Sequence, residues 1–357
     1  MSVKNYSDLT YRGQVQRLRR LVETALGEYG LAGSTLKFIQ HAENATFDVR
    51  SNGRAGGRFL ARVHRPEYHT VPEIRSEMMW LKALSADTGL HVPRPRPNIH
   101  GDTVTVIDDA GVPGPRPMVL LEWMPGRIRE EGHRPVQLRR LGRLMAQLHE
   151  HASTWNPPAG FCRGEWRWDG LFGKDFGVGL SEQELWDTVP DKGRKVMREA
   201  AEIARATMRK LGTGHDVYGL IHADLHLGNL VFAGNSIKPI DFDDCGYGYW
   251  LYDLAVIIDD LHGRPESTAL LQALLDGYEE VRRLSRDQLD YLDDFVAARR
   301  VSLALWVFSM ARTNPGMADW VDGALERSVP RMEEFLRNRR KGESRILANV
   351  LLGQDGD

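Results

Sequence analysis

The chain contains few cysteines and no excess of one charge. Cys162 and Cys245 are the only cysteines among its 357 residues, too few for a disulfide framework or a zinc site built from cysteine. Forty-seven basic and 49 acidic residues leave a net charge of −2, so the composition offers no general attraction to nucleic acid or to an anionic membrane. We therefore expect a globular protein of a reducing compartment that binds neither.

Long apolar runs are also missing. The first residues lack the apolar core of a signal peptide, and no stretch approaches the roughly 18 apolar residues of a membrane span. With 42% apolar and 27% charged residues the composition is that of a soluble globular protein, and the length suits two lobes or domains. These features predict a cytoplasmic protein without a membrane segment.

Two common active-site motifs are absent as well. The chain has no Gly-x-x-x-x-Gly-Lys-Ser/Thr loop, which excludes P-loop chemistry at the level of the motif. It also has no Gly-x-Ser-x-Gly elbow of the kind that carries the nucleophile of serine hydrolases.

The segment between residues 219 and 244 carries polar residues with an informative spacing. His222, Asp224 and Asn229 form the pattern His-x-Asp-x-x-x-x-Asn, and a further carboxylate, Asp241, follows an apolar stretch. Residues 230–240 read as two short strands around Ala-Gly-Asn, a hairpin that would bring Asn229 and Asp241 together. A lone triplet is often only a turn, but the added carboxylate is hard to explain structurally, because uncompensated carboxylates repel one another.

Phosphoryl transfer explains these residue types. The acceptor hydroxyl needs a carboxylate that orients it and takes its proton, a task that suits Asp224. The polyphosphate needs Mg²⁺, which prefers oxygen ligands such as the amide of Asn229 and the carboxylate of Asp241. The pattern therefore indicates the catalytic loop and metal site of a kinase.

In these motifs the chain resembles the aminoglycoside phosphotransferase and choline kinase superfamily, and within it the branch of stress response kinase A and the type II homoserine kinases. The resemblance implies an α+β, bilobal protein-kinase-like fold, with a small antiparallel-sheet N-lobe and a mainly α-helical C-lobe. It implies a nucleotide-binding lobe at residues 1–122, a hinge at 123–127, a catalytic and acceptor-binding lobe at 128–337 and a tail at 338–357. It also places the base on Asp224, a supporting histidine on His222, and ATP with Mg²⁺ as cofactors, the metal being held by Asn229 and Asp241.

The first lobe offers candidates for phosphate binding. Apolar alternation at residues 35–40, 45–50 and 58–64 predicts an antiparallel sheet, preceded by a helix over 15–26. Arg62 stands where protein kinases carry the phosphate-pairing lysine, and its guanidinium is a chemically reasonable substitute, unless it is simply a surface residue. Glu77, on the next helix, would orient Arg62 or else be a solvated glutamate.

Two further segments of this lobe would contact the nucleotide. The turn at residues 41–46 corresponds to the nucleotide-covering loop but contains no glycine, so Asn44 and Thr46 are the candidate donors. An ordinary polar hairpin explains them almost as well. Glu122 ends the strand before the predicted hinge and Met124 lies within the hinge, where the family reads the adenine edge with backbone groups.

In the second lobe, helical periodicity predicts helices near residues 138–148, 196–208, 251–258, 267–280, 286–312 and 318–337. His149 is expected to be a satisfied core histidine. Asp253, near the start of its helix, is expected to brace the catalytic loop by accepting backbone N–H bonds rather than to act as a catalyst.

The short connection after the metal site bears on the acceptor. Only eleven residues separate Asp241 from Asp253, which leaves little room for the activation segment with which protein kinases dock a peptide. We therefore expect a small hydroxylated acceptor, such as an amino alcohol, an aminoglycoside or a homoserine-like compound. Acidic and aromatic residues suit an amine, although packing explains each one equally well; the candidates are Asp243, Asp244, Tyr247, Tyr249, Trp250, Trp168, Trp306 and Trp320.

Two alternatives stay open at this point. The acceptor hydroxyl belongs to a protein Ser or Thr in the first, as the stress-response branch implies. In the second the chain is a nucleotide-binding regulatory module without turnover, which the glycine-free loop and Arg62 allow. We expect a monomer or a homodimer.

Overall fold

The computed structural model describes residues 5–41, 43–52, 56–264, 266–312 and 317–344. The chain divides into two compact units. The first comprises Met1–Pro125 and Pro157–Cys162, and the second comprises Gly126–Asn156 and Arg163–Asp357. The chain thus passes from the first unit to the second between Pro125 and Gly126, inside the segment predicted as a hinge.

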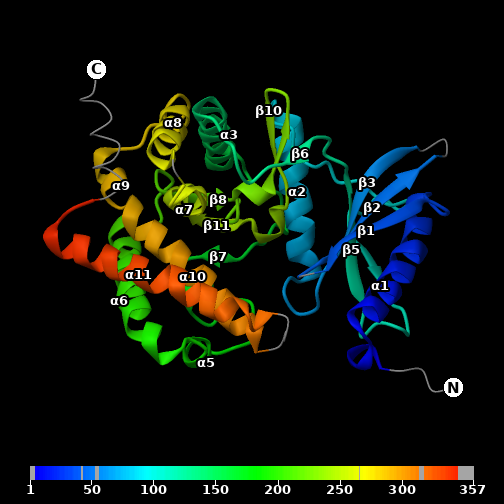
Figure 1. Cartoon of the computed structure of the whole chain (residues 1–357). Helices are drawn as coiled ribbons and strands as arrows, with labels where there is room; N and C mark the ends of the chain where they lie inside the picture. Colours follow the sequence, from blue (N-terminus) through cyan, green and yellow to red (C-terminus); the bar gives the residue numbers. More distant parts are fainter. Residues whose placement is uncertain (1–4, 42, 53–55, 265, 313–316, 345–357) are drawn as a thin grey trace. The chain divides into compact units, whose positions relative to one another are not determined.

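The first unit is built on one antiparallel sheet of five strands in the order β1-β2-β3-β5-β4 (Figure 1). Two helices accompany it, α1 before the sheet and α2 between β3 and β4. The elements are α1 (Tyr11–Ala25), β1 (Thr35–His41), β2 (Ala45–Ser51), β3 (Gly57–Val63), α2 (Val71–Asp87), β4 (Thr105–Ile107) and β5 (Arg116–Glu122).

The core of this unit lies between α1 and the sheet. Leu18, Leu21 and Val22 recur at helical spacing on α1 and are buried against apolar side chains of the strands, among them Phe47 and Val49. An isolated helix of this length is only marginally stable in water, so α1 is stabilised mainly by the burial of these side chains.

Helix α2 begins with a strong local signal. The side-chain oxygen of Thr70 accepts from the backbone N–H of Glu73, and the Glu73 carboxylate accepts from the N–H of Thr70 at 2.8 Å. Pro72 occupies the first turn, where its missing N–H costs nothing. Thr70 and Glu73 thus form a capping box, which fixes the start of the helix that carries Glu77.

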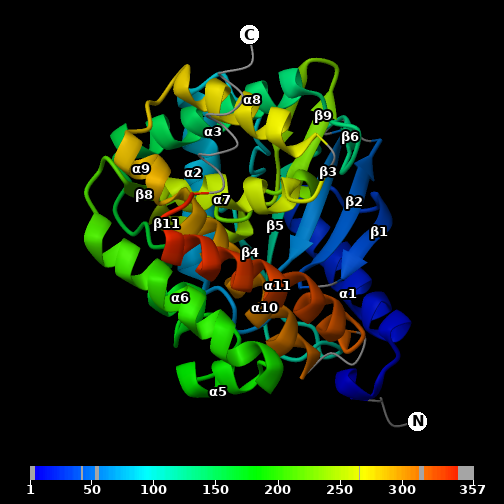
Figure 2. The same cartoon turned by 60° about the vertical axis from the view of Figure 1, so that its left-hand side comes forward.

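The second unit is mainly helical and contains two small sheets, β10-β9-β6 and β7-β11-β8. In both views α10 and α11 lie side by side, and α3 lies beside α8 (Figures 1 and 2). The helices are α3 (Pro135–Thr154), α4 (Trp168–Phe172), α5 (Glu182–Asp187), α6 (Asp191–Leu211), α7 (Trp250–Leu261), α8 (Ser267–Glu279), α9 (Arg286–Asp290), α10 (Leu292–Ala311) and α11 (Trp320–Lys341). The strands are β6 (Arg127–Ile128), β7 (Glu165–Trp166), β8 (Tyr218–Ile221), β9 (Leu230–Ala233), β10 (Ser236–Pro239) and β11 (Gly246–Tyr249).

Helices α3 and α8 approach each other through two glycines. A Cβ atom at Gly142 would lie 1.9 Å from the carbonyl oxygen of Leu274, and one at Gly277 would lie 1.8 Å from that of Arg139. Backbone therefore meets backbone at this crossing, and no side chain larger than hydrogen fits at either position.

The structure confirms the predicted α+β fold, with an antiparallel sheet in the N-terminal part and helices in the C-terminal part. Two predictions about helices need correction, and two predicted segments lie partly outside the described residues. The helix predicted over 286–312 is two helices, α9 and α10, and α11 runs to Lys341 into the predicted tail. Residues 345–357 of that tail, and residue 42 of the turn predicted over 41–46, lie outside the described residues. Among the helices of the described part of the chain, none has the length and hydropathy needed to cross a membrane.

Candidate active site

The His-x-Asp segment forms a loop between β8 and the hairpin of β9 and β10. Only three non-glycine residues of the described chain have a positive φ, and two of them are Ala223 (69°) and Asp241 (61°) in this region. Residues with a Cβ pay a steric cost in this conformation, so the surroundings must hold it in place. Such strain is concentrated where a backbone is shaped for function.

Two carboxylates of α7 supply that support. Asp253 accepts the backbone N–H groups of His222 (2.9 Å) and Ala223 (2.6 Å), and Asp260 accepts that of Leu227 (2.9 Å). The two aspartates stand seven residues apart, which is about two helical turns, so they lie on one face of α7. The expectation that Asp253 braces the loop is confirmed by these hydrogen bonds.

The brace continues into the core through His149. Its Nε2 lies 3.1 Å from Asp253, and its Nδ1 lies 2.8 Å from the hydroxyl of Tyr278. Burial lowers the pKa of His149 against the opposing pull of Asp253, so the ring is neutral, donating from Nε2 and accepting at Nδ1. Burial acts to raise the pKa of Asp253, but the interactions with His149 and His222 together outweigh it and the pKa is lowered. The prediction of a satisfied core histidine is confirmed.

His222 links the loop to the end of the hairpin. Its Nε2 lies 3.0 Å from the carbonyl oxygen of Ile240, and its ring lies with its centroid 4.4 Å from that of Phe242, tilted by 48°. Burial lowers the pKa of His222, so the neutral ring donates this hydrogen bond. The residue is fully buried, so it supports the loop and does not face a substrate.

Asp224 is half-buried, and both of its carboxylate oxygens have partners. Arg299 of α10 donates from Nη2 to Oδ1 at 2.6 Å. Asn229 donates from Nδ2 to Oδ2 at 3.1 Å and to the Asp224 carbonyl oxygen at 2.9 Å. The Nε2 atom of His226 lies 3.6 Å from the carboxylate oxygen Oδ2 of Asp224. Burial acts to lower the pKa of Arg299, but the charge of Asp224 together with the interactions with Tyr252 and Asp259 outweighs it, and the pKa is raised.

The hairpin has the register that the sequence predicts. Leu230 pairs with Pro239, and the N–H of Ile240 donates to the carbonyl oxygen of Asn229 at 3.0 Å. Asn229 and Asp241 therefore flank the open end of the hairpin. Asp241 is exposed, whereas the amide nitrogen of Asn229 is turned towards Asp224, which leaves its carbonyl oxygen on the other side of the amide. These are the oxygen donors that a hard cation prefers.

The residues after Asp241 are held by their backbone. Arg163 donates to the carbonyl oxygens of Asp243 and Cys245, and the indole N–H of Trp166 donates to that of Asp244 at 2.7 Å. Arg163 and Trp166 thus hold the backbone of the segment that follows Asp241.

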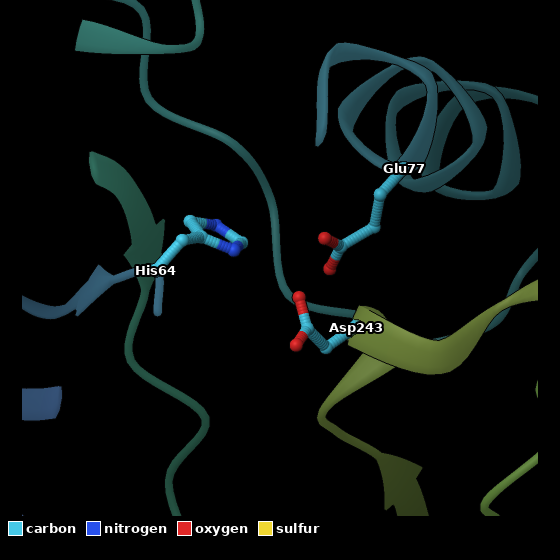
Figure 3. A group of neighbouring side chains, drawn as sticks. All are labelled: His64, Glu77 and Asp243. Carbon is cyan, nitrogen blue, oxygen red and sulfur yellow. The ribbon is translucent and has the colours of Figure 1, made fainter. Parts of the chain in front are cut away.

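In the first unit, Arg62 and Glu77 form an ion pair from β3 to α2. Both side chains are buried, at 2% and 0% exposure, so the pair is shielded from solvent. Figure 3 shows Glu77 extending from α2 and His64 just beyond β3. Thr46 lies directly opposite Arg62 across β2 and β3, so both side chains are on the same face of the sheet. The pairing that the sequence suggested for Arg62 and Glu77 is present.

Of the two residues predicted to contact the adenine, Glu122 already uses its backbone N–H for a hydrogen bond within the first unit. The N–H of Glu122 donates to the carbonyl oxygen of Arg94 at 2.8 Å, and that of Trp123 donates to Arg58 at 3.0 Å. Asn44 accepts the N–H of Arg65 at 3.0 Å, which shapes the turn before β2. Glu122 therefore offers its N–H to the fold, and Met124 remains the better candidate for a nucleotide.

The acceptor candidates fall into two groups. Trp250 is 1% exposed and packs on Gly219 and His149, so burial corrects its assignment to an acceptor pocket. Tyr249 is likewise buried, with its hydroxyl bonded to Met208 at 2.9 Å. Asp243, drawn in Figure 3, is buried and lies in the 3₁₀-helix Phe242–Asp244, whereas Trp320 is 56% exposed. Those that keep partial exposure are Asp244, Tyr247, Trp168 and Trp306.

A sheet with a buried Arg-Glu pair, followed by a helical unit with a braced His-x-Asp loop, defines a phosphotransferase of the kinase-like class. The chain belongs to the Phosphotransferase enzyme family, whose model matches residues 35–290. It is therefore an enzyme, which argues against a regulatory module without turnover.

Relatives support this membership. Amicoumacin kinase of Bacillus subtilis (strain 168) is 24% identical over 294 residues, which cover 79% of this chain and 82% of the relative. Stress response kinase A of Salmonella paratyphi A (strain ATCC 9150 / SARB42) is 22% identical over 312 residues, covering 86% and 84%.

Solved structures agree in fold. A microcompartment-associated aminopropanol kinase matches with a TM-score of 0.78 and 29% identity, covering 92% of this chain and 99% of that one. The amicoumacin kinase hAmiN, in complex with AMP-PNP and Ca²⁺, matches with a TM-score of 0.73 and 20% identity, covering 90% and 96%.

The sequence did not single out three residues of this site. Arg299 lies 75 residues after its partner Asp224, and Arg163 lies more than 75 residues before the segment that it holds. Arginines in a helix or loop carry no local signature, so only the fold reveals such pairs. Asp260 had a usable signal, because it follows Asp253 by seven residues on the same helix.

Proposed function

We propose that the protein transfers the γ-phosphoryl group of ATP, with Mg²⁺, to a hydroxyl group of a small molecule. The observation that carries this proposal is the arrangement around Asp224. Its carboxylate is held by Arg299 and Asn229, in a loop whose backbone donates to Asp253 of α7. A carboxylate placed in this way can orient an acceptor hydroxyl and receive its proton, which is the main chemical demand of the reaction.

We assign the metal to Asn229 and Asp241. The amide oxygen of the first and the exposed carboxylate of the second are hard donors at the same end of one hairpin, and so fit Mg²⁺. When bound, the cation neutralises the charge of the nucleotide phosphates. The complex of hAmiN with AMP-PNP and Ca²⁺ supports a nucleotide with a divalent cation.

We assign nucleotide binding to the first unit. Arg62, oriented by Glu77, would pair with phosphate oxygens, and Thr46 on the same sheet face would add a hydroxyl. Asn44 shapes the covering turn, and Met124 would offer backbone groups to the adenine. A guanidinium keeps its charge when buried, so this pair suits a site with little solvent.

For the acceptor we favour an amino alcohol. The aminopropanol kinase and the amicoumacin kinases act on small molecules by their names, and eleven residues between Asp241 and Asp253 leave little room for peptide docking. Trp306 stands seven residues after Arg299 on α10, about two turns away on the same face, and is partly exposed. Its ring would suit the ammonium group of such a substrate.

The test is a kinase screen over a panel of small alcohols, with ADP release as the readout. The panel includes aminopropanol, ethanolamine, choline, homoserine and an aminoglycoside. Asp224→Asn should lower kcat by roughly 10³-fold while the affinity for Mg·ADP changes little, because the base acts on the acceptor. Wild-type turnover in this variant would refute the role of Asp224.

A protein acceptor is the second candidate, because stress response kinase A is among the relatives. Incubation with ATP followed by phosphopeptide mapping tests it. Saturable turnover of one alcohol in the panel, without phosphopeptides, would exclude it. In either case the ATP requirement suits the cytoplasm.

A further inference from the structure

Arg299 is the charged side chain that contacts the carboxylate of Asp224 most closely. Its Nη2 lies 2.6 Å from Oδ1, and the two side chains are 14% and 26% exposed. The next residue, Arg300, is turned by about 100° around α10 and binds Asp259 instead. Two adjacent arginines therefore serve different partners, and only the first reaches the catalytic loop.

The contact fixes the plane of the Asp224 carboxylate. Arg299 holds Oδ1 while the amide of Asn229 holds Oδ2, and neither bond alone would prevent rotation about the last side-chain bond. A carboxylate has about four lone-pair sites, so two hydrogen bonds leave others for an acceptor hydroxyl. The arrangement thus combines a fixed direction with remaining capacity to accept.

The charge of Arg299 fits this role. A guanidinium weakens a neighbouring carboxylate as a base, but in phosphoryl transfer placement and electrostatics matter more than base strength. Arg299 is itself held in place, because Tyr252 of α7 lies beside it and shares its buried environment. Of its five N–H donors, one on Nη2 is directed at Asp224, so this donor serves the carboxylate of the proposed base.

We propose that Arg299 is a positioning residue, which holds the carboxylate of Asp224 in the orientation that meets the acceptor hydroxyl. This proposal rests on the proposed function, in which Asp224 is the base. Arg299 acts on the reaction through Asp224 and does not recognise an anionic group of the acceptor.

The experiment compares Arg299→Gln, Arg299→Lys and Arg300→Gln in steady-state transfer from ATP to aminopropanol. If aminopropanol is not an acceptor, release of inorganic phosphate to water is followed instead. Arg299→Gln should lower kcat by roughly 10- to 100-fold, the worth of one charge-assisted hydrogen bond, with both KM values within about threefold. Arg299→Lys should restore part of this loss, because the charge returns without the planar fork. Arg300→Gln should lower the midpoint of thermal unfolding but leave kcat within about threefold.

The double variant Asp224→Asn/Arg299→Gln separates the two proposals. If Arg299 works through Asp224, the double variant is no slower than Asp224→Asn alone. A further loss in the double variant, or a raised acceptor KM with unchanged kcat in Arg299→Gln, would overturn the positioning role. An unchanged kcat in folded Arg299→Gln would do the same. Wild-type turnover in Asp224→Asn would instead refute the proposed function itself.

Discussion

Replacing Asp253 with asparagine removes the charge of the fully buried carboxylate of α7 that holds the catalytic loop. The side chain is 0% exposed and accepts from His222 (2.9 Å), Ala223 (2.6 Å) and His149 (3.1 Å). Asparagine has the same shape, but one of its two terminal atoms donates, so at least one donor of the native structure faces another donor.

The magnitude follows from these contacts. Hydrogen bonds to a charged group contribute about 1.5–3 kcal/mol each, and asparagine keeps one acceptor for the three donors. Part of the loss is offset, because the variant no longer buries a charge. We expect the free energy of unfolding to fall by about 3–5 kcal/mol, the range found when one partner of a buried pair is removed.

The assay is guanidinium denaturation at neutral pH, followed by far-UV circular dichroism. Asp260→Asn is the matched control, because Asp260 lies on the same face of α7 but makes one loop bond and is 30% exposed. It should lose about 1 kcal/mol or less. A loss below about 1 kcal/mol for Asp253→Asn, or equal losses in both variants, would refute the reasoning.

The contribution of Asp253 to stability has a defined pH dependence. Its pKa in the folded protein lies below the unfolded value of about 3.9, so its contribution is complete above that pH and is lost as the pH falls through the folded pKa. Acid denaturation of Asp253→Asn should therefore be less steep than that of the wild type at about pH 4 and below.

Three further predictions concern other parts of the molecule. Gly277→Ala would place a methyl group 1.8 Å from the carbonyl oxygen of Arg139, so the free energy of unfolding should fall by about 3 kcal/mol or more in a urea titration; an unchanged midpoint would contradict the backbone contact. Burial raises the pKa of Asp294 from 3.8 to about 6, so the folded state holds a proton that the unfolded state releases. Relative to Asp294→Asn, the wild type should therefore lose stability as the pH rises from about 4 to about 6, and a constant difference would contradict this. Asp241→Asn should weaken calorimetric binding of Mg·ADP by roughly tenfold or more while metal-free ADP binds as before; equal weakening of both would argue against a metal ligand.

Short-range motifs were the most predictable part of the site. The hairpin from Asn229 to Asp241 and the bond from Asp253 to the loop follow from residue types within about 30 positions of one another. Turn composition and strand alternation predict the hairpin. An aspartate in the first turn of a helix beside a loop is well placed to accept backbone N–H groups of that loop.

Long-range partners could not be predicted in the same way. Arg299 has the same local sequence character as Arg300, yet one binds Asp224 and the other Asp259. Their assignment depends on the rotation of α10 against its neighbours, which side-chain packing decides and periodicity does not. For the same reason the sequence predicts Trp250 as an acceptor contact, although its ring fills the space beside Gly219.

The bonds from the loop to Asp253 also bear on hydrogen exchange. The amides of His222 and Ala223 donate to a carboxylate in the first turn of a buried helix, so their protons can exchange only when α7 separates from the loop. They should exchange as slowly as the core of α7, although they lie one and two residues from the proposed base. Asp224 would thus lie beside backbone amides whose hydrogen bonds open no more readily than those of the protein interior.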